Sequence, residues 1–136
     1  SLDNLGLAET LKDVVSTYQA QHPKITMNLQ LNGDLQGLGE TVSINLYRIV
    51  QESLNNALKY AKATRIDVQL TKNTKGDLQL SVKDNGVGMD VEAVDQTKHF
   101  GLLGMRERAQ ALHGSFKVDS ALKAGMAIYI NIPTNL

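Results

Sequence analysis

Leu-Tyr-Arg-Ile-Val-Gln-Glu-Ser-Leu-Asn-Asn-Ala-Leu-Lys-Tyr-Ala, residues 46–61, predicts the middle of a long amphipathic helix that runs roughly over 42–63. Its apolar positions spread over one half of the helix: Leu46, Ile49, Val50, Leu54, Ala57 and Ala61. Glu52, Asn56 and Lys59 fall within roughly 60° of one another on the other half, because the α-helical period is about 3.6 residues. We therefore expect a carboxylate, an amide and an ammonium along one polar face.

This polar face has two interpretations. Mg²⁺ prefers oxygen ligands and usually shares one or two protein oxygens with substrate phosphates. Asn56 offers such an oxygen, Glu52 can hold a metal-bound water or polarise an attacking group, and Lys59 can pair with a phosphate. The spacing alone, however, favours an ordinary solvated face with an i,i+4 polar pair.

The sequence on either side of this helix predicts an α/β protein. Amphipathic periodicity indicates further helices, and alternating apolar residues indicate strands. The helices are expected over roughly 6–21 and 102–112, the strands over 25–31, 66–70, 78–82, 116–118 and 126–132, and a glycine-containing loop over 32–39. The strands at 66–70 and 78–82 form a predicted hairpin, and His113-Gly114 offers a glycine suited to the left-handed position after a helix. The expected fold is a single domain, 1–136, built as a two-layer α/β sandwich with a mixed, largely antiparallel sheet.

A second motif, Asp84-Asn85-Gly86-Val87-Gly88, follows directly after an alternating strand. Asn-Gly after a strand is usually a hairpin turn, but no partner strand follows within reach. The functional interpretation places Asp84 beside a cavity, where glycines let a flat ring approach the backbone. A carboxylate there can accept a hydrogen bond from the exocyclic amine of adenine, whereas guanine presents an oxygen and is rejected.

A third motif, Gly101-Leu102-Leu103-Gly104, opens the last predicted helix. A helix N-terminus with free backbone N–H groups attracts anions, and glycine allows a phosphate to come close. The simpler alternative is a flexible helix start. Arg106 and Arg108 are either exposed helix charges or contacts to a nucleotide or partner domain. The preceding stretch 89–100 is a candidate lid over the phosphates, with Lys98 and His99 as candidate contacts.

The order of the three motifs resembles that of the GHKL ATPases, the family that includes gyrase, Hsp90, MutL and the histidine kinases. Residues 46–61 resemble the N-box of the NarL-type sensor histidine kinases, and 84–88 resemble the G1 box. Gly-Leu-Leu-Gly-Met-Arg-Glu-Arg-Ala, residues 101–109, resembles the G2 box of that subfamily, and Leu5-Gly6-Leu7 resembles the join to the dimerising helices. The resemblance covers nearly the whole chain.

The resemblance implies a Bergerat ATP-binding fold and a role for each motif residue. Asn56 corresponds to the magnesium-binding asparagine, Glu52 to the acidic residue before it, Lys59 to a phosphate contact and Asp84 to the adenine-reading aspartate. The nucleotide loops correspond to Gly86, Gly88, Gly101, Leu102 and Gly104. The implied reaction is transfer of the ATP γ-phosphoryl group to a histidine on a separate dimerisation domain.

The resemblance also implies partners. These are ATP with Mg²⁺, the dimerisation and phosphoacceptor domain of the same kinase, and a response regulator of the NarL/LuxR type. The implied parent kinase is a homodimer, and the domain itself is cytoplasmic even where the parent is anchored in the inner membrane. Direct contact with nucleic acid is not expected.

The sequence departs from the family pattern at two positions. Tyr60 stands where the subfamily usually has histidine, and tyrosine is common there in other histidine kinases, where it lies against the nucleotide. Met126 stands where the last strand usually has threonine, which removes a hydroxyl near Asp84. None of the three histidines, His22, His99 and His113, has the helical context of a phosphoacceptor.

Composition limits the other classes. The formal net charge of +0 leaves no overall electrostatic attraction to nucleic acid or membrane, and the absence of cysteine excludes disulfides and thiolate metal sites. No apolar run approaches the ~20 residues of a membrane span, and no signal peptide is evident. Two alternatives to the kinase remain: an ATP-hydrolysing clamp of the gyrase or Hsp90 type, and an interaction module with a degenerate nucleotide site, to which Met126 points.

Overall fold

A computed structural model of the chain describes residues 2–88 and 101–133, and for residues 2–5, 60 and 61 it describes the backbone alone. The elements are, in order, α1 (Leu2–Gln21), β1 (Thr26–Asn32), α2 (Glu40–Asn56), a π-helical turn η1 (Ala57–Ala61), β2 (Arg65–Lys72), β3 (Leu78–Asp84), α3 (Leu102–Ala111), β4 (Ser115–Ser120) and β5 (Met126–Ile132). The predicted strands and helices are all present, with ends shifted by a few residues.

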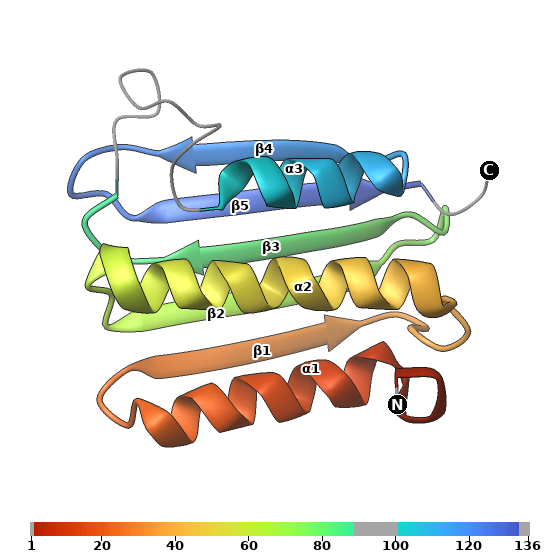
Figure 1. Cartoon of the computed structure of the whole chain (residues 1–136), viewed down its shortest axis with the longest axis horizontal. Helices are drawn as coiled ribbons and strands as arrows, with labels where there is room; N and C mark the ends of the chain where they lie inside the picture. The colour runs from red at the N-terminus through yellow and green to blue at the C-terminus, as the bar shows by residue number, and fades with distance from the viewer. Residues whose placement is uncertain (1, 89–100, 134–136) are drawn as a thin grey trace.

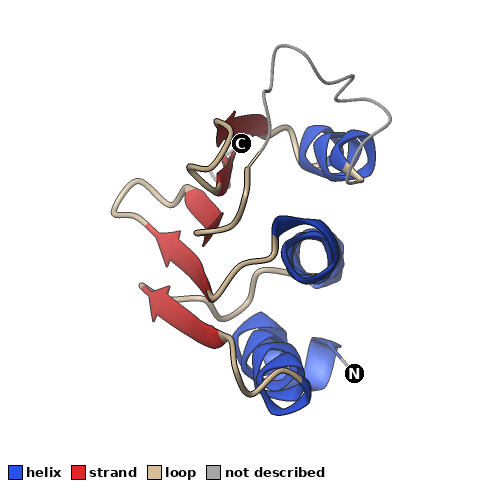
Figure 2. Cartoon of the chain, turned by 90° about the vertical axis from the view of Figure 1, so that its left-hand side faces the viewer, coloured by secondary structure: helices blue, strands red, loops and turns tan. Residues whose placement is uncertain are grey.

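The described strands form one sheet in the order β1-β2-β3-β5-β4. The β1–β2 pair is parallel and the other three pairs are antiparallel. The antiparallel β2–β3 pair confirms the predicted hairpin. Helices α1, α2 and α3 cover one face of the sheet, and no helix of the described residues lies on the other, so this part of the chain has two layers (Figures 1 and 2). The predicted two-layer sandwich with a mixed, largely antiparallel sheet is confirmed.

The core lies between these layers. Leu46, Ile49, Val50 and Leu54 of α2 are each 0% exposed, which confirms the predicted apolar half of this helix. The alternating side chains of β2, β3 and β5 that face the helices are buried against them. Among the described residues, no helix combines the length and apolarity needed to cross a membrane.

The long predicted helix over 42–63 is not continuous α-helix. The α-helical part ends at Asn56, the next five residues form the π-helical turn, and Lys62 ends it in the left-handed conformation with φ 53°. A π turn has a wider hydrogen-bond spacing than an α turn. Lys59 therefore leaves the α-helical phase that placed it in line with Glu52 and Asn56.

The end of α3 also differs from the prediction. The left-handed residue is His113, with φ 59°, and Gly114 follows it without a positive φ. His113 N–H donates to the Gln110 carbonyl at 3.0 Å and Gly114 N–H to the Ala109 carbonyl at 2.8 Å, the pattern of a Schellman cap. Glycine is needed at 114 for space, because a Cβ there would lie 2.7 Å from the Asn131 carbonyl oxygen.

Candidate functional site

The three sequence motifs meet at one end of the molecule. The C-terminal end of α2 with its π turn, the C-terminal end of β3 and the N-terminal end of α3 all lie on the same side (Figure 1). This arrangement follows from the topology, because α2 and β3 end there and α3 begins there. The motif residues thus come from elements far apart in the sequence.

Glu52 and Gly101 are in direct contact across this end. Gly101 is the N-cap of α3 with φ 66°, and a Cβ built on it would meet the Glu52 side chain, 2.8 Å from its carboxyl carbon. The Glu52 carboxylate is half-buried beside the backbone that opens α3. The structure therefore joins the first and third motifs at one point.

Asn56 and Lys59 differ in their surroundings. Asn56 is one of the few buried polar residues of the described chain, 7% exposed, at the last α-helical position of α2. Lys59 lies in the π turn and is exposed. The π turn was not predicted, and such turns are common at functional sites because they re-aim side chains. The Tyr60 side chain lies outside what the structure describes.

Asp84 ends β3, in register with Ile66 of β2 and Met126 of β5. Its Oδ1 accepts a hydrogen bond from the Gly86 N–H at 2.8 Å, and the Met126 N–H also donates to its carboxylate. Burial raises the pKa of the Asp84 carboxyl above its ordinary value, and the two backbone N–H donors oppose that rise only in part. The carboxylate of Asp84 is thus half-buried, held by two backbone N–H groups, with apolar residues in register on both neighbouring strands.

The loop after Asp84 is fixed by side-chain and backbone contacts rather than by a hairpin. Asn85 Oδ1 accepts from the backbone N–H groups of Thr64 and Arg65, each at 2.9 Å, and its Nδ2 donates to Thr64 Oγ1 at 2.8 Å. Asn85 therefore ties the loop to the start of β2. The sequence pointed to a turn at this Asn-Gly pair but gave no sign of the amide's long-range partner.

The turn between β4 and β5 supports the same loop from the other side. Lys123 N–H donates to the Val87 carbonyl at 2.5 Å. Gly88, with φ 64°, has no room for a Cβ, which would collide with the Ala121 carbonyl and lie 2.7 Å from that of Gly125. Glycine is required at 88 for packing onto this turn, a reason distinct from the approach of a ligand.

Leu102 and Gly104, in the first turn of α3, differ in how they pack. Leu102 is 1% exposed, so its side chain belongs to the core and only its backbone can face a ligand. A Cβ on Gly104 would meet nothing within 4 Å, so the described structure gives no packing reason for glycine there.

The two arginines of α3 have local contacts. The Arg106 guanidinium lies 5.6 Å from the centre of the Phe116 ring, and Arg108 Nη1 donates to Asn45 Oδ1 of α2 at 3.4 Å. These contacts agree with the interpretation as helix-surface charges. Lys98, His99 and the candidate lid over 89–100 lie outside the described residues.

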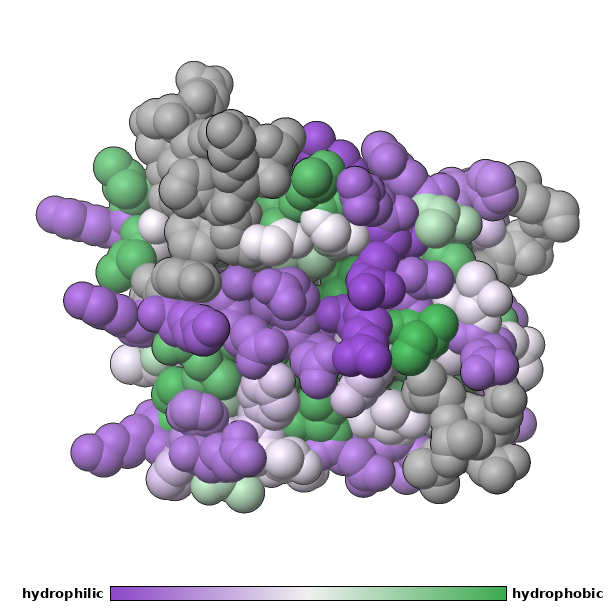
Figure 3. All heavy atoms as spheres, in the orientation of Figure 1, coloured by the Kyte–Doolittle hydropathy of each residue, from purple (hydrophilic) through white to green (hydrophobic). Residues whose placement is uncertain are grey.

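Hydrophilic side chains form a band over α2 on the helix-covered face (Figure 3). Tyr18 Oη donates to Asn55 Oδ1 at 2.8 Å, which links α1 to the helix that carries Glu52 and Asn56. Burial, and then the nearby Tyr47, raise the pKa of the Tyr18 hydroxyl. Sequence periodicity placed Tyr18 in the first helix but gave no sign of its hydrogen bond to Asn55.

The fold defines a two-layer α/β sandwich in which Glu52, Asp84 and Gly101, one from each motif, come from elements that meet at one end of the sheet. The family described as histidine kinase-, DNA gyrase B- and HSP90-like ATPase matches residues 41–136. The chain belongs to this family of ATP-binding domains.

Relatives in sequence are sensor kinases. The chain is 36% identical over its whole length to the signal transduction histidine-protein kinase/phosphatase DegS of Bacillus subtilis, covering 36% of that protein. It is 32% identical over 98% of its length to the oxygen sensor histidine kinase NreB of Staphylococcus carnosus, covering 38% of it. The chain thus spans little more than a third of the length of these relatives.

Solved structures confirm the fold. The histidine kinase domain of the blue-light activated histidine kinase EL346 of Erythrobacter litoralis superposes with a TM-score of 0.75 at 23% identity, over 93% of this chain and 60% of that one. The mycobacterial sensor histidine kinase MprB superposes with a TM-score of 0.71 at 22% identity, over 93% of both chains.

Proposed function

We propose that the chain is the catalytic domain of a sensor histidine kinase, which binds Mg-ATP and delivers the γ-phosphoryl group to a histidine on a separate dimerisation domain. The observation that carries the proposal is the contact between Glu52 and Gly101, the N-cap of α3. It brings an acidic side chain beside a helix start suited to phosphate. Phosphoryl transfer depends mainly on positioning and charge neutralisation, which such a site supplies.

The base end of the nucleotide is assigned to Asp84. Its carboxylate accepts a hydrogen bond from the exocyclic amine of adenine, with Gly86 and Gly88 in the loop beside it. Lys59 pairs with a phosphate, and the backbone from Gly101 to Gly104, including Leu102, lies along the triphosphate. Tyr60 lies against the nucleotide.

The residues fit a magnesium ion that is shared with phosphate. No cluster of three or more His, Cys, Asp or Glu able to hold a metal occurs among the described residues. Asn56 and Glu52 lie one helical turn apart, and an amide with a carboxylate suits Mg²⁺ that takes its other ligands from phosphate and water. When bound, the ion neutralises charge on the phosphates. Asn56 and Glu52 hold and orient it.

In the proposed transfer, the lone pair of a histidine nitrogen forms a bond to the γ-phosphorus. The bond from that phosphorus to the β,γ-bridging oxygen breaks, and ADP leaves with the bridging oxygen. The proton that the imidazole loses passes to Glu52 or to water. Where Glu52 takes this proton, its carboxylate orients the attacking ring and acts as the general base.

The acceptor histidine and the dimerising helices belong to another part of a longer kinase in this proposal. That kinase is a homodimer and passes its phosphoryl group to a response regulator of the NarL/LuxR type. The domain works in the cytoplasm, as one unit over 1–136.

Calorimetric titration of the chain with a non-hydrolysable ATP analogue, with and without Mg²⁺, tests the proposal. We expect adenine-selective, magnesium-dependent binding, with the GTP analogue as the control. Asn56→Ala should remove the magnesium dependence, and an unchanged Mg²⁺ requirement in this variant would refute the role of Asn56.

Two outcomes favour the alternatives. Steady ATP turnover by the chain alone indicates a hydrolytic clamp of the gyrase or Hsp90 type. Absence of nucleotide binding by the folded chain indicates an interaction module whose site is degenerate.

A further inference from the structure

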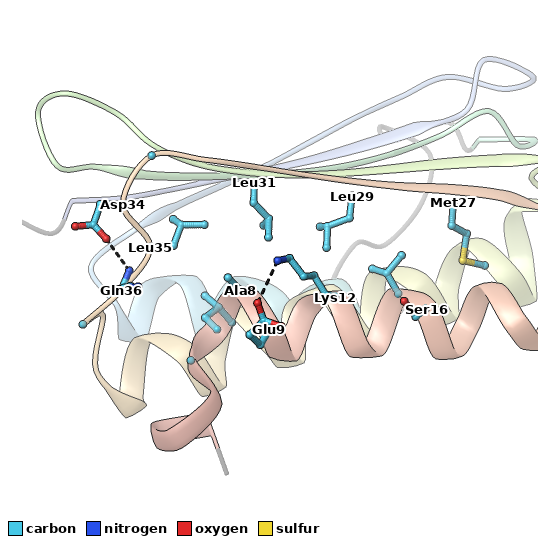
Figure 4. Close-up of a pocket in the computed structure, with 15 residues that line it drawn as sticks. Ala8, Glu9, Lys12, Ser16, Met27, Leu29, Leu31, Asp34, Leu35 and Gln36 are labelled. Carbon is cyan, nitrogen blue, oxygen red and sulfur yellow. Dashed lines mark hydrogen bonds and ion pairs between the residues drawn. The ribbon is translucent and has the colours of Figure 1, made fainter.

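A groove of about 930 Å³, lined by none of the nucleotide-motif residues, lies between α1, β1 and the loop that follows β1. Met27, Leu29 and Leu31 of β1 point across it toward α1 (Figure 4). Met27 is buried, but Leu29 and Leu31 are only half-buried, so part of their apolar surface faces the groove. The β1 side of the groove is thus partly apolar and lies along an edge strand of the sheet, whereas Glu9, Lys12 and Asp34 are among the polar residues that line the rest.

The outer edge of β1 carries backbone groups that no other strand of the described sheet pairs with. Thr26 N–H points to the β2 side, where it donates to the carbonyl of Thr64, the residue before β2, at 2.9 Å. Alternate residues of a strand direct their N–H and C=O groups to opposite edges. The backbone groups of Asn28 and Gln30 therefore also point to β2, and the backbone groups of Leu29 and Leu31 point away from the sheet. The same residues therefore present both free backbone groups and half-exposed apolar side chains.

Gln19 of α1 already occupies the first part of this edge. Its Oε1 accepts from the Met27 N–H at 2.9 Å, and its Nε2 donates to the Ile25 carbonyl at 2.6 Å. One carboxamide thus supplies an acceptor and a donor at successive outward positions, as a neighbouring strand would. Past Met27 the described residues offer Leu29 and Leu31 no such partner.

β1 also lacks the features by which proteins usually protect an edge strand. Its sequence, Thr-Met-Asn-Leu-Gln-Leu-Asn, contains no charged residue and no proline, whereas the other edge strand, β4, carries Lys117 and Asp119. Charge and proline on an edge strand prevent pairing with other chains. Their absence from β1 indicates an edge that is kept available for pairing.

The charges around the groove indicate what the partner carries. Lys12 Nζ lies 3.1 Å from Glu9 Oε1, so these two charges offset each other. Asp34 lies beyond the end of β1, where its Oδ1 accepts only a neutral backbone N–H, from Gln36 at 3.0 Å. Among the described groove residues, the charge left without a counter-ion is therefore negative, at the Leu31 end.

We propose that this groove binds an extended segment of a partner protein, which adds to the sheet as a strand beside β1. The segment pairs its backbone with Leu29 and Leu31 and places two apolar side chains, two residues apart, against them. A lysine or arginine at its Leu31 end lies near Asp34. Strand addition of this kind gains affinity from main-chain hydrogen bonds and specificity from alternate side chains. The proposal is independent of nucleotide binding.

The probe is a set of four fluorescent synthetic peptides of the pattern Thr-X-Thr-X-Thr-Lys-Lys. Each X is independently Val or Ile, which gives the four combinations. Each has a control peptide in which the backbone nitrogens that face β1 are methylated. We expect saturable binding of at least one peptide below about 1 mM, and at least about tenfold weaker binding of its methylated control. Amide exchange at Leu29 and Leu31 should slow on binding, while Asn28 and Gln30 are protected throughout.

Variants of the chain test the same geometry. Asp34→Lys should weaken binding of the basic peptides, because it reverses the charge that attracts them. Leu31→Thr should also weaken binding, because it removes apolar surface from the groove without adding a charge. Gln30→Thr, on the open face of the same strand, should leave the affinity unchanged. Nucleotide binding should be unaffected in all three, which separates this proposal from the kinase assignment.

Three results overturn the proposal. One is that none of the four peptides binds at 1 mM (about −4 kcal/mol). A second is that methylated and unmethylated peptides bind equally. The third is that Leu29 and Leu31 amides are already protected in the free chain with concentration-dependent dimerisation, which would assign the edge to a second copy.

Discussion

Asp84 shows at the scale of one residue how the fold sets a chemical property. The sequence placed this carboxylate at a strand end, but only the structure shows Ile66 and Met126 in register beside it and backbone N–H groups from Gly86 and Met126 on it. Burial outweighs those donors and raises the pKa of Asp84. Folding thus favours the neutral carboxyl form of Asp84 over the charged carboxylate.

Replacing Asp84 with asparagine should therefore separate stability from binding. Asp84 has its ordinary pKa in the unfolded chain and a higher pKa in the folded chain. At pH values between the two, the native state binds more protons than the unfolded state, so the free energy of unfolding falls as pH rises through that range. We expect Asp84→Asn to remove this dependence, to be at least as stable as the parent at neutral pH, and to lose adenine-selective binding. Urea unfolding at several pH values and calorimetry measure the two effects.

Asp13→Asn is the control, because Asp13 is an exposed residue of α1. It should leave the pH dependence of stability and nucleotide binding unchanged. If Asp84→Asn bound nucleotide as tightly as the parent, the proposed contact between Asp84 and adenine would be wrong.

Gly101 and Gly104 allow a matched comparison of two glycines in one motif. Alanine at 101 must adopt a positive φ, at a cost of about 1 kcal/mol, and its Cβ pushes the Glu52 carboxylate aside. Alanine at 104 lies in a helix with open space around it, and should stabilise the chain by about 0.5–1 kcal/mol. We expect Gly101→Ala to reduce phosphotransfer to an added dimerisation domain.

The Gly104→Ala variant also tests whether phosphate approaches this backbone closely. Weaker ATP binding with higher stability would support a ligand reason for Gly104. Unchanged binding would leave Gly101 as the functional glycine of this pair. Denaturant unfolding and phosphotransfer assays on both variants decide between these results.

At the scale of elements, hydrophobic periodicity predicted the helices and strands because each buries one face. Leu46, Ile49, Val50 and Leu54 marked the buried side of α2 correctly. Periodicity could not predict where α-helical hydrogen bonding changes to π at Ala57, since the pattern of apolar residues does not specify the hydrogen-bond spacing of a single turn. For the same reason it assigned the left-handed position to Gly114 rather than to His113.

The turn between β4 and β5 is an element whose position affects the site. A Cβ on Gly125 would collide with the Asp84 carbonyl, a backbone atom that cannot turn away as a side chain would. Gly125→Ala should therefore cost more than the roughly 1 kcal/mol of a positive φ alone. It should also weaken nucleotide binding, because Asp84 must shift.

Gly37→Ala supplies the comparison for this turn. Gly37 also has a positive φ, 69°, but nothing lies within 4 Å of its added Cβ. Urea unfolding of both variants should show the larger loss for Gly125→Ala. Equal losses would mean that the turn does not hold Asp84 in place.

At the scale of the whole molecule, the sequence predicted the two-layer fold, since amphipathic helices interleaved with alternating strands must share one core. It could also place Glu52, Asp84 and Gly101 in three motifs. It could not predict that Glu52 touches Gly101, or that Asn85 ties the loop to β2, because those contacts join segments whose distance the chain pattern does not fix. The sequence also could not predict that β1 lies at an edge of the sheet, because that depends on the strand order.

The family match begins at residue 41, yet the structure packs the preceding residues into the same core. Leu7 and Leu11 of α1 are 1% and 0% exposed, and β1 pairs with β2 along seven residue pairs from Thr26↔Arg65 to Asn32↔Thr71. Removing a fully buried leucine side chain costs about 2–5 kcal/mol. We expect Leu11→Ala to lower the stability of the whole domain by this amount.

Hydrogen exchange under native conditions measures that effect separately in α1 and in β3. If 1–136 is one cooperative unit, slow amides in both elements should lose protection by the same free energy. Asp13→Ala, at an exposed position of α1, should change it by less than about 0.5 kcal/mol. Loss of protection in α1 alone, with β3 unchanged, would divide the chain at the start of α2 and make residues 1–39 an appendage to the ATP-binding unit.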